Sequence, residues 1–148
     1  MVKQADDQEL YNEHLRYECE MLVTTDQVIG RVFPLYPVNN ALIEAFCFHA
    51  RVLIEFFNEK YVGTSPFVDR DYRAWASGKP SKILVTKLNT HVAHLTRNRT
   101  TNPELKINDA DRSELLRCIV AQVFNFASHL KPEFERSVLY DAIALKLA

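Results

Sequence analysis

The sequence predicts an all-α fold, a bundle of four main helices with short additional helices, forming one domain over residues 1–148. A length of 148 residues is typical of a single domain. The chain has only three glycines, whereas folds with many tight turns need more of them. Apolar residues recur every three or four positions over long stretches, which is the periodicity of amphipathic helices.

The first helix is predicted from Asp6 to Arg31. Acidic residues at its start suit the positive end of a helix dipole, and Gly30 and Pro34 favour a stop near its end. Its apolar residues form two neighbouring stripes: Leu10, Tyr17, Met21 and Val28, and Tyr11, Leu15, Leu22 and Ile29.

The second helix is predicted from Asn40 to Lys60, with Asn39 or Asn40 as its N-cap. It is the most hydrophobic helix, which favours a central place in the bundle. Arg51 and Glu55 are four residues apart on its charged face and can form an ion pair. Its broad apolar face comprises Leu42, Ala45, Phe46, His49, Val52, Leu53, Phe56 and Phe57.

Residues 61–80 contain turn-forming glycine, serine and proline and are predicted to be irregular. Within them, 69–75 is expected to form one or two helical turns, with Trp75 closing one end of the core. A third helix is predicted from Pro80 to Asn98, followed by a loop over 99–107. Its apolar stripe comprises Ile83, Leu84, Leu88, Val92 and Leu95.

The fourth helix is predicted from Asp109 to Leu130, with Asn108 as its N-cap. A short last helix is predicted to begin at Pro132, with Glu133 and Glu135 in its first turn. The three cysteines are widely spaced within apolar stretches, which predicts buried, reduced thiols. With a polar start and no apolar run long enough to span a membrane, the chain is expected to be cytoplasmic.

A net charge of −1 conceals an uneven distribution. Residues 1–69 hold five Lys and Arg against eleven Asp and Glu, while residues 70–106 hold eight against two. The basic middle segment can attract a polyanion, or it can face the acidic first segment within one chain or across a dimer. The sequence favours the second arrangement slightly.

The segment Lys87 to Arg99 concentrates residues suited to RNA chemistry. Histidine titrates near neutral pH and can take a proton from a 2′-hydroxyl group, while arginine stabilises charge on phosphate. Because helical residues three apart share a face, the predicted catalytic residues are His91, His94 and Arg97. The predicted ligand-binding residues are Arg99, Asn98, Lys87, His49 and Arg51.

Two other functions are compatible with the same residues. A metal-binding bundle would use His91 and His94 with His49 and His129, and only Glu44 and Glu55 are natural carboxylate partners. The sequence contains no HExxH motif, so no metal ligand or cofactor is assigned. A non-catalytic interaction module would use the apolar faces of the second and fourth helices to form a homodimer or to bind a protein partner.

Two segments carry a family resemblance. Asn40 to Phe57, which includes AFCFHARVLIEFF, and Leu88 to Thr100, LNTHVAHLTRNRT, resemble uncharacterised bacterial helical proteins similar to the HEPN group. The resemblance implies a helical bundle, commonly dimeric. It also implies metal-independent RNase activity in toxin–antitoxin or phage-defence systems.

The catalytic motif of that group is an arginine followed by a histidine after four to six residues. No arginine of this chain is followed by a histidine at that spacing. The catalytic pair is therefore not carried over from the family. The expected function is nucleotide or RNA binding, with weak or lost RNase activity.

Overall fold

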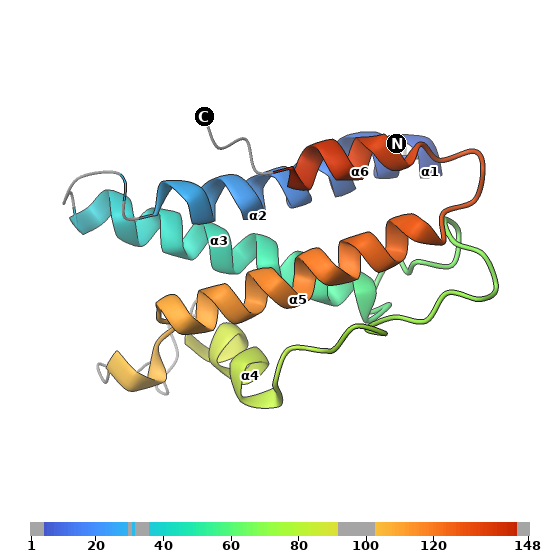
Figure 1. The fold of residues 1–148 in the computed structure, drawn as a ribbon. Helices are drawn as coiled ribbons and strands as arrows, with labels where there is room; N and C mark the ends of the chain where they lie inside the picture. The colour runs from blue at the N-terminus through green and yellow to red at the C-terminus, as the bar shows by residue number, and fades with distance from the viewer. Residues whose placement is uncertain (1–4, 30, 32–35, 92–102, 145–148) are drawn as a thin grey trace, which may run out of the picture.

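The computed structural model describes residues 5–29, 31, 36–91 and 103–144, and it confirms the all-α fold (Figure 1). Within these ranges, the β pairing is confined to one bridge between Val68 and Leu130. The helical elements are α1 (Asp7–Glu9), a π-helical segment (Leu10–Leu15), α2 (Arg16–Val28), α3 (Tyr36–Phe57), α4 (Lys82–His91), a 3-10 turn (Pro103–Leu105), α5 (Asp109–Ser128) and α6 (Arg136–Ile143).

Four helices enclose the core in a ring (Figure 1). In this ring α2 packs along α3 and α6, and α5 packs against α6 and α3. The prediction that the helix over 40–60 is central agrees with the burial of α3. Its core residues are spaced by three or four positions, as one face of a helix requires: Phe46, Ala50, Leu53 and Phe57.

The fourth place in this ring belongs to α6 and not to α4. In only eight residues α6 buries Leu139, Ala142 and Ile143. By contrast α4 contacts chiefly α3, and Ile83, which the sequence placed on its apolar stripe, is 74% exposed. Leu84 and Leu88 are the residues with which α4 reaches the core.

The helix starts differ from several predictions. α3 begins at Tyr36, so Asn39 and Asn40 lie inside the helix and neither is its N-cap. Pro37 falls in the first turn, where a missing N–H removes no helical hydrogen bond. α4 begins at Lys82 and not at Pro80, because Ser81 Oγ accepts a hydrogen bond from the Leu84 N–H at 3.2 Å.

The predicted start of the last helix at Pro132 is also wrong. α6 begins at Arg136, which leaves Glu133 in the preceding turn and Glu135 at the N-cap. The segment 69–75 forms turns and not a helix. There Asp69 Oδ1 accepts hydrogen bonds from the backbone N–H groups of Asp71 and Tyr72, which favours a side-chain-stabilised turn over a helical one.

The start of α5 is as predicted. Asn108 and Asp111 form a reciprocal capping box, in which each side chain accepts a hydrogen bond from the backbone N–H of the other. Lys87 Nζ lies 2.9 Å from Asp111 Oδ2, so the same carboxylate attaches α4 to the start of α5.

The irregular segment 58–80 is attached to the C-terminal end of α5. Asp69 N–H donates to the His129 carbonyl at 2.9 Å, and Lys131 N–H donates to the Phe67 carbonyl at 2.8 Å. Nearby, the buried Gln122 accepts a hydrogen bond from the Trp75 N–H and donates one to the Tyr72 hydroxyl, both at 2.6 Å. Trp75 packs partly buried against the core, as predicted.

The three cysteines are buried and unpaired, as the sequence predicted. Burial raises the pKa of the thiols of Cys19, Cys47 and Cys118 above the ordinary value. Within the described ranges, no helix combines the length and the apolar character needed to cross a membrane.

Candidate functional site

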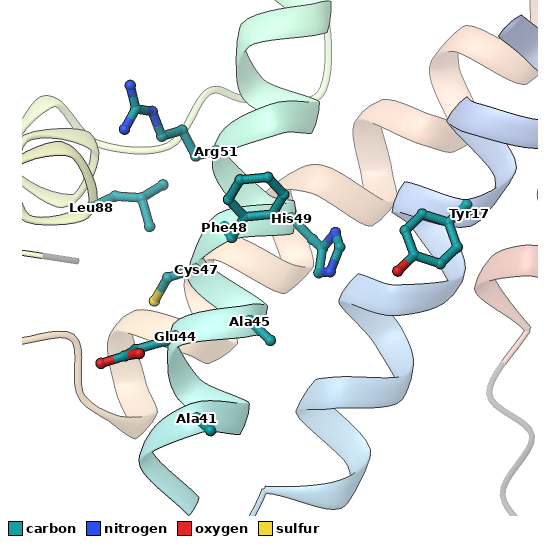
Figure 2. A pocket seen from close by; sticks show the side chains of 9 residues that line it. All are labelled: Tyr17, Ala41, Glu44, Ala45, Cys47, Phe48, His49, Arg51 and Leu88. Carbon is teal, nitrogen blue, oxygen red and sulfur yellow. The ribbon is translucent and has the colours of Figure 1, made fainter. Parts of the chain in front are cut away.

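A pocket of about 550 Å³ opens along the outer side of α3, between α2 and α4 (Figure 2). Figure 2 shows His49 and Tyr17 on one side of the exposed Phe48 ring, and Arg51 and Leu88 on the other. The remaining lining residues are Ala41, Glu44, Ala45 and Cys47. The volume lies within the range of roughly 300–1,000 Å³ that small-molecule sites occupy.

His49 is held by a carboxylate from the neighbouring helix. Its Nδ1 lies 2.7 Å from Glu18 Oε2 of α2, and the two side chains are 7% and 19% exposed. Because an ionised carboxylate only accepts hydrogen bonds, the proton of the neutral imidazole belongs on Nδ1. Nε2 is then the hydrogen-bond acceptor of the ring, which can also accept a proton.

Two exposed aromatic side chains flank this imidazole. Tyr17 is 51% exposed and Phe48 is 58% exposed. Their centroids lie 5.7 and 5.3 Å from the His49 ring, and both pairs meet edge to face. Helical spacing predicts Tyr17 on an apolar stripe, but half of this residue is exposed beside the pocket.

Arg51 lines the pocket and forms the ion pair predicted for it. Its Nε lies 3.2 Å from Glu55 Oε1, and Lys60 Nζ lies 2.9 Å from the same oxygen. Partial burial would raise the pKa of Glu55, but the hydrogen bonds from Lys60 and Arg51 outweigh it and lower that pKa. The Arg51 side chain remains 29% exposed, and a guanidinium group has further N–H donors for a ligand.

The predicted site residues are therefore brought together only in part. His49 and Arg51 line the same pocket. Lys87 lies next to the lining residue Leu88, but it is 17% exposed and bound to Asp111. His91 is the final residue of α4, and its side chain lies outside the described part of the chain. The predictions for His94, Arg97, Asn98 and Arg99 also fall outside the described residues.

Of the other histidines whose side chains the structure describes, neither His14 nor His129 lines this pocket. His129 Nδ1 lies 3.1 Å from Asp69 Oδ1, near the far end of α5. Partial burial would raise the pKa of Asp69, but hydrogen bonds from the Asp71 N–H and from His129 keep it below its usual range.

The carboxylate partners of His49 and His129 are Glu18 and Asp69, and not Glu44 or Glu55 as the sequence suggested. The same prediction for His91 and His94 falls outside the described side chains.

A metal centre finds no support in this part of the chain. Among the described residues, no three His, Cys, Asp or Glu side chains are grouped so that they could hold a metal ion. His49 is instead a buried residue whose polar atom is paired with a carboxylate, as buried polar groups generally are.

The sequence did not predict two aromatic residues of the pocket, Tyr17 as an exposed ring and Phe48, nor Glu18, which pairs with His49. The exposure of Phe48 could have been predicted, since Phe48 lies on the same helical face as Glu44, Arg51 and Glu55. An aromatic residue on a charged face is expected to be exposed. Glu18 carried no comparable signal, because its pairing with His49 depends on how α2 crosses α3.

Comparisons with protein-family models, with curated proteins and with solved structures found no match to this chain. The site is therefore interpreted from its own residues and geometry.

Proposed function

We propose that this chain is a helical domain that binds RNA or a nucleotide in the α3 pocket, in the manner expected of a HEPN-like protein. The observation that carries the proposal is the grouping of two exposed aromatic rings, a carboxylate-held imidazole and an arginine around one pocket. These are the chemical groups that recognise a nucleobase and its phosphate.

The aromatic side chains supply the surface for a base. Exposed apolar rings are costly in water, and a nucleobase stacked on Phe48 covers that surface without requiring a particular sequence. Ala41, Ala45 and Leu88 add apolar side chains to the lining of the pocket. Glu44, which is exposed at the rim, can accept a hydrogen bond from an exocyclic amine.

The polar groups supply contacts to phosphate and sugar. Arg51 offers N–H donors to phosphate oxygens, while Nε2 of His49 can accept a hydrogen bond from a ribose hydroxyl. The basic segment 70–106 would add long-range attraction for a polyanion. Glu18 acts as a positioning residue in this arrangement, because it fixes the orientation of the imidazole.

Binding is tested with fluorescently labelled single-stranded RNA at low salt, measured by anisotropy. Phe48→Ala should raise the dissociation constant roughly 5- to 150-fold, because base–aromatic stacking contributes about 1–3 kcal/mol. Arg51→Ala should weaken binding and reduce its dependence on salt. Ile83→Ala is the control, since Ile83 is also an exposed apolar residue but lies outside the pocket. Wild-type protein that binds neither RNA nor nucleotides would refute the proposal.

The proposal extends to weak metal-independent cleavage by the segment 87–99. The 2′-hydroxyl oxygen would attack the adjacent phosphorus and the 5′-oxygen would leave, giving a 2′,3′-cyclic phosphate and a 5′-hydroxyl end. His94 would take the 2′-hydroxyl proton, a water molecule would give the leaving 5′-oxygen its proton, and Arg97 would stabilise the charge developing on the phosphate.

Cleavage of labelled RNA should therefore persist in excess chelator and be lost in His94→Ala. His14→Ala is the control, because His14 is an exposed histidine that does not line the pocket. Cleavage that needs a metal ion, or that survives in His94→Ala, would contradict the assignment of the nuclease activity. The binding test above is independent of this result.

A further inference from the structure

Three side chains of the α3 pocket follow a fixed order along the helix. Glu44, Phe48 and Arg51 are separated by four and three residues, so they lie in one row on the surface of α3. Figure 2 shows the aromatic ring between the carboxylate and the guanidinium group. At a rise of about 1.5 Å per residue, the ends of the row are about 10 Å apart along the helix axis. The pocket therefore offers an anionic, an aromatic and a cationic group in sequence.

The carboxylate of Glu44 is available to a ligand. Glu44 is exposed, and none of the ion pairs or side-chain hydrogen bonds between described residues involves it. By contrast, Glu18 pairs with His49, and Glu55 pairs with Arg51. Glu44 thus presents unused hydrogen-bond acceptors at the rim of the pocket.

A carboxylate distinguishes nucleobases by the donors on their edges. It only accepts hydrogen bonds, and its two oxygens can accept side by side. Guanine presents two adjacent donors on its Watson–Crick edge, N1–H and the 2-amino group. Adenine and cytosine place a donor beside an acceptor there, and the N3–H of uracil lies between two carbonyl oxygens. A carboxylate therefore forms two hydrogen bonds with guanine, and meets a lone pair on each of the other bases.

We propose that the α3 pocket prefers guanine, with the Watson–Crick edge on Glu44, the ring stacked on Phe48 and the phosphate on Arg51. This preference rests on the proposed nucleotide or RNA binding and adds to it the identity of the base. The row is comparable in length with a nucleotide, from the edge of its base to its phosphate. Arg51 also disfavours a cationic ligand, which would otherwise suit a carboxylate beside an aromatic ring. A free guanine nucleotide and a guanosine in single-stranded RNA both carry the required groups.

The preference is measured with the full chain and labelled pentanucleotide RNAs that are uridine except at the central base, followed by anisotropy. Central guanine should bind at least about fivefold more tightly than central adenine. Hypoxanthine, which lacks the 2-amino group, should fall between them. Competition by unlabelled guanosine monophosphate would show that the free nucleotide is sufficient, whereas a preference seen only in RNA would show that the strand is needed.

Glu44→Gln separates hydrogen bonding from charge. An amide offers one acceptor and one donor, which matches adenine better than guanine. The guanine preference should therefore disappear or reverse, whereas the lost negative charge changes both affinities alike. Glu13→Gln is the control, because it removes an exposed glutamate that does not line the pocket, and it should keep the wild-type preference.

The outcomes separate this inference from the proposed binding. Equal affinity of the wild type for guanine and adenine, with weaker binding by Phe48→Ala, overturns the guanine preference and leaves the RNA binding in place. A guanine preference that survives in Glu44→Gln overturns the role of Glu44. A wild type that binds neither RNA nor nucleotides overturns both.

Discussion

Gln122 is 1% exposed, and both ends of its amide are used inside the protein. The oxygen accepts from the Trp75 N–H, and the nitrogen donates to the Tyr72 hydroxyl. A buried amide that loses such a partner costs the free energy of its desolvation. The two hydrogen bonds of Gln122 therefore hold the segment 58–80 against α5. The apolar pattern of α5 does not predict this role for a glutamine.

Tyr72→Phe should lower the free energy of unfolding by about 1–3 kcal/mol, because it leaves the Gln122 N–H unsatisfied. Urea denaturation followed by circular dichroism measures the change. Tyr61→Phe is the control, since Tyr61 is 75% exposed, and it should alter stability by less than about 0.5 kcal/mol. Equal effects of the two substitutions would show that the buried hydrogen bond contributes little.

The same substitution has a pH signature. Burial raises the pKa of Tyr72 to about 12, whereas the unfolded chain has a tyrosine pKa of about 10. The neutral phenol thus favours the folded state, and this contribution is complete below pH about 10 and lost as the pH rises to about 12. The stability of Tyr72→Phe should fall less steeply than that of wild type across this interval. Tyr11, whose pKa burial also raises, remains in both proteins.

The helices themselves follow from local sequence to different degrees. Apolar spacing is a property of one segment, so it predicted the existence of α2, α3, α4, α5 and α6 and the burial of most of their core residues. The first residues of the helices were predicted less accurately, because several residues that could act as N-caps lie within a few positions of one another. At α3 the sequence favoured Asn39 or Asn40 as the N-cap, but the helix already begins at Tyr36. Pro37 is compatible with this earlier start, because a proline in the first turn removes no helical hydrogen bond.

The difference between an asparagine that caps a helix and one that lies inside a helix can be measured by substitution. Asn108→Ala should cost about 1 kcal/mol of stability, because it removes the side chain that caps α5. Asn40→Ala should cost nothing and can add a few tenths of a kcal/mol, since alanine favours a helix interior more than asparagine does. A large loss in Asn40→Ala would instead support the cap that the sequence suggested.

The candidate site was predictable to a smaller extent than the helices. His49 and Arg51 are on one helix, so their proximity follows from spacing alone. Glu18 reaches His49 across 31 residues, and Leu88 reaches the same pocket from α4. Such contacts depend on which helices become neighbours, and helix periodicity carries no information on that choice.

At the scale of the whole molecule, the ion pair that the structure describes for the basic segment does not lead to the acidic first segment of the same chain. Lys87 of the basic segment pairs with Asp111 of α5 and not with a carboxylate of residues 1–69. In the acidic segment, Asp26 pairs with Arg112 of α5. Helix α5 thus forms ion pairs with both segments, while Arg70, Lys79 and Lys82 are exposed.

The position of α6 beside α2 has a consequence for synthesis of the protein. A ribosome that has released only the first 130 residues has produced three sides of the ring, and the apolar surface of α2 and α5 that α6 covers stays in contact with water. The ring is complete only when the segment around α6 packs against the N-terminal helices, which bond to it across more than a hundred positions of the chain. A nascent chain stalled before Leu139 should accordingly be a better client for chaperones that bind apolar surface than the finished domain.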